Sequence, residues 1–420
     1  MPHRTYIFVS LLLLLQYLVY YSFIKYLKTT KIYKPNQRYW VLIIFCLFNF
    51  PFLIVSLLTG GNFDISEWLK YLIMEPFYFW QGATLFIALW LLIGKIIKLP
   101  FKIPVWLVKI FRPGRRKIEE VKNVKAIQAV DLGRRKFIRY STMALSAYAF
   151  TGSAYGIIKH NSYEVDYKEI KLDNLPPEFK GFTITLISDI HAGQYMDENE
   201  MKEYADVVNS LNSDIICIPG DFVNFDSNDG HHVAKAFRDL KAKYGIYGSL
   251  GNHDFFNNPD YLTEILKNES PIQLMRNRHF TVNKNGKELY LLGVDDTYHS
   301  GASFDGVVMT WLDAMHEHLL QTYENYKSSP KILLCHKPYG FDMIAKRDID
   351  LTLAGHTHGG QVVPFKFGKI NVSFAGFVSP YIEGLYKTGK SNMYVSRGIG
   401  TVLLPIRINC PPEITKITLV

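Results

Sequence analysis

Five short clusters of Asp, Asn and His follow apolar runs in the second half of this 420-residue chain. Carboxylate, amide and imidazole groups together are the ligands that proteins offer to divalent transition metals. Four of these clusters, taken alone, are more typical of a turn, a helix start or a structural histidine, whereas the two imidazoles two positions apart in the last cluster fit adjacent metals equally well. Their order and shared position after apolar runs instead indicate a metal site. In chain order the clusters are Asp189-Ile190-His191, Gly220-Asp221, Gly251-Asn252-His253-Asp254, His336 and Gly355-His356-Thr357-His358-Gly359-Gly360.

The apolar runs before the clusters have the length and β-rich composition of strands. Polar stretches at 197–212 and 229–242 have helical patterns, and Asp197 is a plausible N-cap with Glu200 completing a capping box. Strands that alternate with helices predict an α/β core, whose strand ends meet at one edge where ligands bind. The predicted strands are 182–188, 214–218, 245–250, 288–293, 331–335, 350–354, 393–396 and 414–419.

The ordered motifs DIH, GD, GNHD, H and GHTH resemble those of the calcineurin-like metallophosphoesterase family over roughly residues 180–362. The resemblance implies an α/β fold, a β-sandwich flanked by helices in four αββα layers, here preceded by an all-α transmembrane region. A further set of motifs resembles the bacterial membrane-associated phosphodiesterase branch: GGQVVP (359–364), YIEGLY (381–386), VSRGIG (395–400) and PIRINCPPEI (405–414).

The resemblance also implies two divalent metal ions with Asp221 bridging them. A mixed nitrogen and oxygen ligand set suits Mn, Fe, Zn or Co better than Mg. Two such cations activate a shared water as hydroxide and offset the charge of the attacked phosphate. By position, the first ion is assigned to Asp189, His191, Asp221 and His358, and the second to Asp221, Asn252, His336 and His356.

Two catalytic roles follow for the residues beside Asn252. His253 is the expected acid that protonates the leaving alkoxide, or else a clamp on the phosphate, and Asp254 is expected to orient it by a hydrogen bond. Lys337 follows the ligand His336, and we expect it at the surface, with substrate binding as the alternative. The four cysteines show no spacing typical of a disulfide framework or zinc site.

The first 160 residues predict a membrane region, and residues 161–420 form the predicted catalytic domain. Segments 5–24, 39–60 and 71–94 are long and apolar enough to span a bilayer, and 141–158 is a less apolar fourth segment. Arg134 to Arg139 precede this fourth segment, either as an internal twin-arginine-like export signal or as the basic flank of a helix.

Charge sets the predicted topology. Residues 1–160 hold 22 Lys and Arg against 6 Asp and Glu, whereas residues 161–420 hold 25 against 32. The basic loops, including 95–139, are expected in the cytoplasm, which places the catalytic domain outside the inner cell membrane. If 141–158 does not span, that domain stays in the cytoplasm. The acidic balance of the catalytic domain argues against a nucleic-acid partner.

We therefore expect a membrane-anchored hydrolase of phosphodiesters or phosphomonoesters, with membrane lipids around it and a lipid or envelope-related phosphate as substrate. No obligate protein partner is inferred. A nucleotide-linked sugar pyrophosphate is also compatible with the resemblance. The alternatives are a nuclease and a metal-binding receptor or assembly factor without turnover. A transporter would need paired polar residues inside the spans, and Glu75 is the only acidic residue within them.

Overall fold

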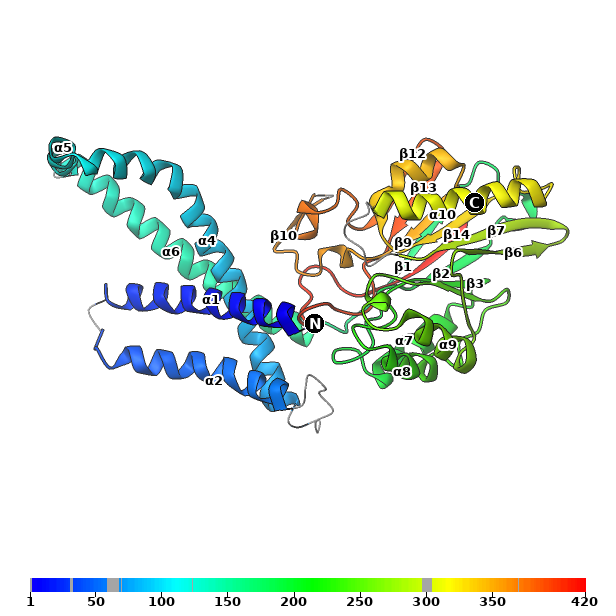
Figure 1. Cartoon of the computed structure of the whole chain (residues 1–420), viewed down its shortest axis with the longest axis horizontal. Coiled ribbons are helices and arrows are strands. Elements are labelled where there is room, and N and C mark those ends of the chain that lie inside the picture. Colours follow the sequence, from blue (N-terminus) through cyan, green and yellow to red (C-terminus); the bar gives the residue numbers. More distant parts are fainter. Residues whose placement is uncertain are drawn as a thin grey trace. The chain divides into compact units, whose positions relative to one another are not determined.

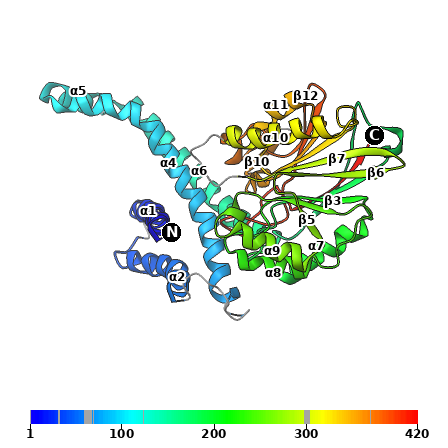
Figure 2. The ribbon, with the colours of Figure 1, turned by 45° about the vertical axis from the view of Figure 1, so that its right-hand side comes forward.

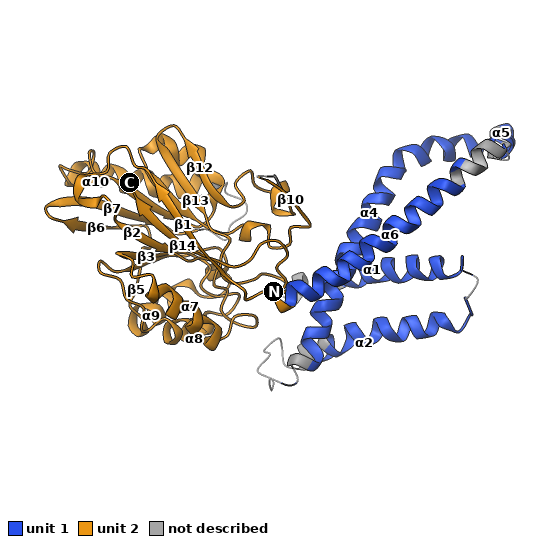
Figure 3. Ribbon diagram, turned by 180° about the vertical axis from the view of Figure 1, so that it is seen from behind, with its two compact units in different colours: residues 1–157 blue, residues 158–420 orange. Residues whose placement is uncertain are grey.

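The computed structural model describes residues 2–30, 33–58, 68, 70–122, 124–296, 304–368 and 370–420. The chain divides into two compact units, residues 1–157 and 158–420 (Figure 3). We call them the helical unit and the catalytic unit and describe each by itself.

The helical unit consists of long helices. They are α1 (Pro2–Leu27), α2 (Gln37–Leu58), the π-helical turn η1 (Lys70–Met74), α4 (Glu75–Ile110), α5 (Arg112–Lys122) and α6 (Lys125–Ile158). Among the described residues, Ser10–Leu27 and Leu72–Ile110 are long and apolar enough to cross a membrane by length and composition. The expected spans 5–24 and 39–60 fall on α1 and α2, with residues 59 and 60 outside the described chain.

The region expected as a basic loop, 95–139, is largely helical instead. Helix α4 continues through Pro100 and Pro104 to Ile110, and α6 already begins at Lys125. The lysines of this region recur among apolar residues at intervals that suit an amphipathic helix with one solvent-exposed face. A high content of Lys and Arg is therefore compatible with a helix here and does not indicate a loop. The expected fourth segment, 141–158, is the last part of α6.

A cluster of polar side chains is buried among the apolar helices of this unit. The amide of Gln16 on α1 donates to Gln81 Oε1 and Thr84 Oγ1 on α4, both at 2.7 Å. Gln81 in turn donates to Asn49 Oδ1 on α2 at 2.7 Å, and Trp80 Nε1 donates to Gln16 Oε1 at 3.0 Å. The cluster therefore links α1, α2 and α4. Hydrogen bonds between polar residues of different apolar segments were not expected from the sequence.

The catalytic unit contains two six-stranded sheets (Figure 1). The first has the order β1-β14-β2-β3-β4-β5, in which β2 to β5 are parallel and β14 is antiparallel to β2. Its strands are β1 (Glu164–Ile170), β14 (Glu413–Leu419), β2 (Thr183–Leu186), β3 (Ile215–Pro219), β4 (Ile246–Ser249) and β5 (Ile272–Leu274).

The second sheet has the order β12-β13-β9-β8-β7-β6, with parallel pairing from β13 to β7 and antiparallel strands at both edges. A separate two-stranded ribbon, β10 (Phe365–Phe367) and β11 (Ile370–Val372), lies apart from both sheets. The other strands are β12 (Gly384–Thr388), β13 (Ser391–Val395), β9 (Leu351–Ala354), β8 (Lys331–Cys335), β7 (Lys287–Val294) and β6 (Arg278–Lys284).

Helices cover the outer face of each sheet, as Figure 2 shows. On the first sheet lie α7 (Glu198–Ser210), α8 (Gly230–Ala236) and α9 (Pro259–Glu269), and on the second lie α10 (Phe304–Thr322) and α11 (Phe341–Ile344). A core that includes Ile184, Cys217 and Leu334 fills the space between the sheets. The expected four-layer αββα sandwich is therefore confirmed.

Every predicted strand is present, and the predicted helix 197–212 forms as α7, whereas only Gly230–Ala236 of the predicted helix 229–242 is α-helical. The predicted capping box at Asp197 is also confirmed: its carboxylate accepts from Glu200 N at 2.9 Å, and Glu200 Oε2 accepts from Asp197 N at 3.1 Å. Strands β1, β5, β6, β10, β11 and β12 were missed. Apart from the β10–β11 ribbon, they are edge strands or short ones, so their sequences lack the continuous apolar run of a central strand.

Candidate metal centre

The five polar clusters meet where the carboxyl ends of strands from both sheets come together. Strands β2, β3 and β4 of the first sheet lead into Asp189, Asp221 and Asn252. Strands β8 and β9 of the second sheet lead into His336 and into the 356–358 loop. Because each sheet supplies part of the cluster, the sandwich itself sets the spacing of the side chains.

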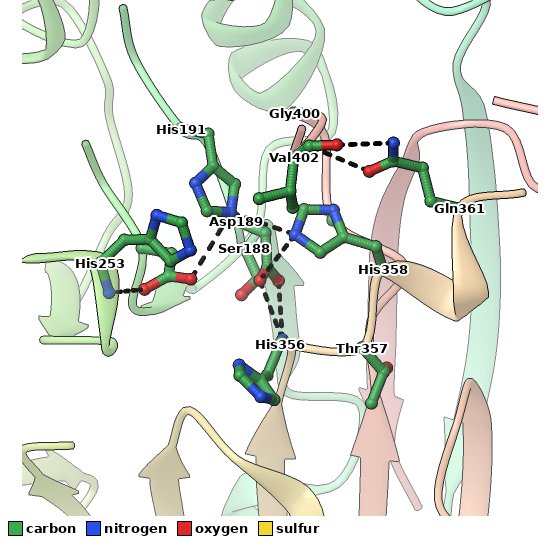
Figure 4. A network of polar contacts seen from close by, with 12 residues as sticks. Ser188, Asp189, His191, His253, His356, Thr357, His358, Gln361, Gly400 and Val402 are labelled. Atoms are coloured by element: carbon green, nitrogen blue, oxygen red, sulfur yellow. Dashed lines mark hydrogen bonds and ion pairs between the residues drawn. The ribbon is translucent and has the colours of Figure 1, made fainter. Parts of the chain in front are cut away.

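One half of the centre is formed by Asp189, His191 and His358 (Figure 4). The Nε2 atoms of His191 and His358 lie 3.0 Å apart, and His358 Nε2 lies 3.5 Å from Asp189 Oδ1. All three side chains are buried. Their ligand atoms lie within 4.8 Å of one another, which is the spacing of groups that share one ion.

The other half is formed by Asp221, His336 and His356, whose ligand atoms also lie within 4.8 Å of one another. Asp221 Oδ2 lies 3.1 Å from His336 Nε2 and 3.5 Å from His191 Nε2. The carboxylate of Asp221 therefore stands between the two halves, where a bridging ligand must be.

Several buried atoms of the centre fit a bound cation. Within the described chain, Asn252 Oδ1 and His191 Nδ1 are buried and accept or donate no hydrogen bond. A buried polar atom without a partner costs about 1–3 kcal/mol, so such atoms need another source of stabilisation. A divalent cation held there would supply it for the amide oxygen of Asn252.

The electrostatics leave most of the imidazoles neutral. Burial lowers the pKa of His191 to about 3, and burial also holds the pKa values of His356 and His358 well below their ordinary range. A neutral imidazole keeps the lone pair that a metal needs. These three side chains are therefore ready to act as ligands at neutral pH.

His336 and the two aspartates behave differently. Burial opposes protonation of His336, but its charge interaction and hydrogen bond with Asp221 outweigh burial and raise its pKa to about 10. Burial raises the pKa of Asp189 to about 6, whereas the pull of His336 overcomes burial and holds the pKa of Asp221 well below its usual value. A proton and a cation therefore compete for His336 Nε2.

The backbone of the centre is unusual as well. Non-glycine residues with positive φ are a few per cent of most structures and are typical of strained functional loops. Five of the seven predicted ligands have this conformation. They are Asp189 (φ 52°), His191 (φ 50°), Asp221 (φ 57°), His356 (φ 71°) and His358 (φ 50°).

Two glycines allow the ligand loops to approach each other. A Cβ atom on Gly251 would lie 2.2 Å from Asp221 Oδ1, and one on Gly355 would lie 2.1 Å from Asp189 Oδ2. No L side chain fits at such distances, so the glycine that precedes Asn252 and the one that precedes His356 are sterically required. This explains the glycine in the GNHD and GHTH motifs.

The structure differs from the expectation for Asp254. Its carboxylate accepts hydrogen bonds from the backbone N–H groups of Asp221 (2.9 Å), Val223 (3.1 Å) and Gly251 (2.8 Å). It therefore holds together the two loops that carry Asp221 and Asn252, and these three bonds give it no part in orienting His253.

The partner of His253 is a backbone group instead. His253 Nδ1 lies 2.7 Å from the carbonyl oxygen of Asn224, to which it donates its proton. This leaves Nε2 as the nitrogen available for chemistry. The ring packs edge-on against His191 with centroids 4.5 Å apart, and its backbone N–H donates to Asp221 Oδ1 at 2.8 Å. Every residue has a backbone carbonyl, so the sequence could not show that the partner of His253 is the carbonyl of Asn224.

Two further residues, Lys337 and Arg407, lie close to the centre. Lys337 is not a free surface residue, because its side chain is mostly buried and pairs with the buried Asp296 at 2.9 Å. Arg407, in the PIRINCPPEI motif, is fully buried, donates to the carbonyls of Arg397 and Gly398, and places its NH2 group 3.4 Å from His358 Nδ1.

Comparisons with known proteins agree with this geometry. The calcineurin-like phosphoesterase family pattern matches residues 182–360. The chain is 30% identical over 296 residues to the uncharacterized metallophosphoesterase YkuE of Bacillus subtilis, an alignment that covers 69% of this chain and 98% of that protein. It is 29% identical over 257 residues to a "transmembrane protein with metallophosphoesterase domain" of Danio rerio, covering 60% of this chain and 56% of that one.

The uncharacterized metallophosphoesterase Cj0846 of Campylobacter jejuni is 27% identical over 286 residues, 68% of this chain and 70% of that protein. The fold and the cluster define a metal-dependent phosphoesterase. The chain belongs to the calcineurin-like phosphoesterase family.

Proposed function

We propose that this protein is a membrane-anchored phosphoesterase that binds two divalent cations and cleaves phosphodiesters or phosphomonoesters of lipid or envelope-related substrates. The observation that carries the proposal is the meeting of six ligand-type side chains at one sandwich edge, with Asp221 between two groups of histidines. The seventh proposed ligand, Asn252, has a buried Oδ1 without a hydrogen-bond partner. Asp189, His191, Asp221 and His358 hold one ion, and Asp221, Asn252, His336 and His356 hold the other.

The bound cations supply Lewis acidity, which activates water and offsets charge on the phosphate. The chain's own groups do the rest. His253, with Nδ1 tied to the Asn224 carbonyl, presents Nε2 to the leaving oxygen and gives it a proton. Because a nitrophenolate leaves without protonation and an alkoxide does not, the proton matters only for alkyl esters.

The test compares Asp221→Asn and His253→Ala with the wild-type chain in the presence of Mn²⁺. We expect Asp221→Asn to lose hydrolysis of bis-nitrophenyl phosphate, because the bridging carboxylate is gone. We expect His253→Ala to lose roughly 100-fold or more on an alkyl ester, within the range of general acid catalysis, and much less on the nitrophenyl ester. Equal rates for wild type and both variants would instead support a metal-binding receptor without turnover.

We propose further that the helical unit anchors the protein in the inner cell membrane and that α6 carries the chain outward. The apolar helices α1 and α4 support the anchor, and the Lys and Arg excess of residues 1–160 supports the orientation. Protease added to spheroplasts should then digest the catalytic unit while sparing a cytoplasmic marker. Protection of the catalytic unit until the membrane is permeabilised would place it in the cytoplasm and contradict this topology.

A further inference from the structure

An aromatic surface lies beside the metal centre on the catalytic unit. We define it as Phe365, Phe367, Val372, Phe374, Phe377 and Val378, in and after the β10–β11 ribbon. Phe374 is 78% exposed and Phe377 is 87% exposed. Among the described residues of the catalytic unit, four of the five exposed phenylalanines belong to this surface. Such a concentration marks an interaction site, because single exposed apolar residues are normally scattered.

The aromatic surface is tied to the loop that carries His356 and His358. Asn371 Nδ2 donates to the carbonyl of Gly359 at 2.8 Å, and the side chain of Ser373 packs against Gly360. Figure 1 shows β10 at the periphery of the catalytic unit, apart from the two central sheets. Whatever covers the aromatic surface therefore comes to lie beside the metal ligands.

A second exposed apolar residue approaches the same loop from another part of the chain. Leu403 is 71% exposed, and the carbonyls on either side of it, those of Val402 and Leu404, both accept from Gln361 Nε2 at 3.0 Å. Gln361 directly follows the 356–360 loop. The aromatic surface and Leu403 are thus both connected by hydrogen bonds to the stretch of chain at and just after the metal-binding loop 356–360.

The charge of the segment favours a bilayer over a protein groove as the occupant. Residues 364–378 contain two lysines and no acidic residue, although residues 161–420 as a whole contain more Asp and Glu than Lys and Arg. One of these lysines, Lys366, pairs with Glu383 at 2.7 Å, so the segment is at most weakly basic. Phenylalanines beside lysines are typical of segments that enter the headgroup region of anionic membranes.

Chain connectivity points the same way. Residues 159–163 join the end of α6 to the start of β1, so the connection reaches about 18 Å when fully extended. If the helical unit is anchored as proposed above, the catalytic unit remains at the surface of that same membrane.

We propose that the aromatic surface docks onto the lipid bilayer that holds the helical unit, so that the metal centre takes a lipid-linked phosphate at the membrane surface. The proposal rests on the membrane anchoring under "Proposed function". Docking would let the phosphate of a lipid reach the metal ligands while its acyl chains remain in the bilayer.

The experiment measures the depth of single nitroxide labels by electron paramagnetic resonance. The full chain, with Cys46→Ser to remove the half-exposed thiol, is reconstituted in vesicles of phosphatidylethanolamine and phosphatidylglycerol at 3:1. Labels are placed at Phe377→Cys on the aromatic surface, at Leu14→Cys on an exposed side of α1, and at Glu324→Cys on the exposed segment after α10. Relaxation by oxygen reports the bilayer, and relaxation by a water-soluble nickel chelate reports water.

Docking predicts that the ratio of oxygen accessibility to nickel accessibility is at least fivefold higher for the label at position 377 than for the label at position 324. Adding Phe367→Asp and Phe374→Asp should return position 377 to the value at 324. Equal nickel accessibility at 377 and 324 would overturn docking, as would shielding of 377 from both reagents, which would indicate a protein partner.

The label at 14 separates the two proposals. If position 14 is lipid-exposed and 377 lies in water, the anchor stands and docking fails. If position 14 itself lies in water, the anchoring proposal fails, and docking fails with it. Hydrolysis of soluble bis-nitrophenyl phosphate by the same samples tests the phosphoesterase proposal independently, since the aspartate variants leave every metal ligand in place and should change that rate less than twofold.

Discussion

Replacing Asp254 with Asn tests whether this carboxylate holds the metal loops or orients His253. The wild-type carboxylate accepts three backbone N–H groups, two at Oδ2 from Asp221 and Gly251 and one at Oδ1 from Val223. Asparagine keeps only one acceptor oxygen. Its best arrangement places that oxygen at the Oδ2 position and turns the amide NH2 toward the buried N–H of Val223.

The expected cost follows from that lost contact. The Val223 N–H would be left buried and without an acceptor, which costs about 1–3 kcal/mol. Since about 1.4 kcal/mol corresponds to a factor of ten, metal affinity should fall roughly 10- to 100-fold. The loss should appear in the metal affinity because Asp254 connects the loop of Asp221 to the loop of Asn252.

The assay measures hydrolysis of a nitrophenyl and an alkyl phosphate ester across a Mn²⁺ titration. We expect Asp254→Asn to shift the Mn²⁺ dependence for both esters equally, with most of the rate restored at high Mn²⁺. Asp214→Asn is the matched control: Asp214 accepts from Thr183 N and Oγ1 at the opposite ends of the strands, so Mn²⁺ dependence should not change.

A different outcome would refute this reasoning. If Asp254→Asn loses activity selectively on the alkyl ester, and excess Mn²⁺ does not restore it, then Asp254 acts through the proton of His253. The variant would then reproduce His253→Ala, and the Asn224 carbonyl would not be the group that orients the imidazole.

Three further outcomes can be checked separately. Because the pKa of His336 is about 10, metal binding at neutral pH should release about one proton, and the metal Kd should rise about tenfold per unit of falling pH; calorimetry in two buffers counts the protons. Burial, and to a smaller extent repulsion from Asp226, raises the pKa of Asp229 in the folded chain to about 6. The same carboxyl has a pKa of 3.8 in the unfolded chain, so the unfolded chain loses this proton first as pH rises. That destabilises the wild-type chain above pH 6 and not below pH 4. Asp229→Asn should therefore stabilise the catalytic unit by about 1–2 kcal/mol at pH 7 after allowance for partial exposure, and by almost nothing at pH 4, as thermal melting would show. In the helical unit, Gln81→Leu removes the central link to Gln16 and should destabilise the bundle by about 1 kcal/mol in detergent unfolding without changing ester hydrolysis.

The candidate metal ligands could be picked out of the sequence because they follow central strands. A buried parallel strand is a nearly continuous apolar run, so its end is visible in the sequence, and the polar residues beyond it stand out. Asp189 after β2 and His336 after β8 are examples. The convergence of such ends at one sheet edge then brings residues far apart in the chain into one cluster.

The supporting contacts could not be predicted in the same way. His253 is held by a carbonyl oxygen, which every residue carries, and Lys337 is withdrawn from solvent by Asp296, forty-one positions earlier in the chain. Long-range partners of this kind depend on tertiary packing that no local pattern records.

The strained backbone connects these two observations. A left-handed conformation at a non-glycine residue costs on the order of 1 kcal/mol or more, and five ligands adopt it, so the loops alone would relax. Asp254 opposes that relaxation with three hydrogen bonds, and Asp189 does so by accepting from the N–H of His356 at 2.9 Å. The candidate ligands therefore follow strand ends, but buried carboxylates that accept from backbone N–H groups maintain their geometry. For this reason, replacing Asp254 should weaken metal binding although Asp254 is not itself a candidate ligand.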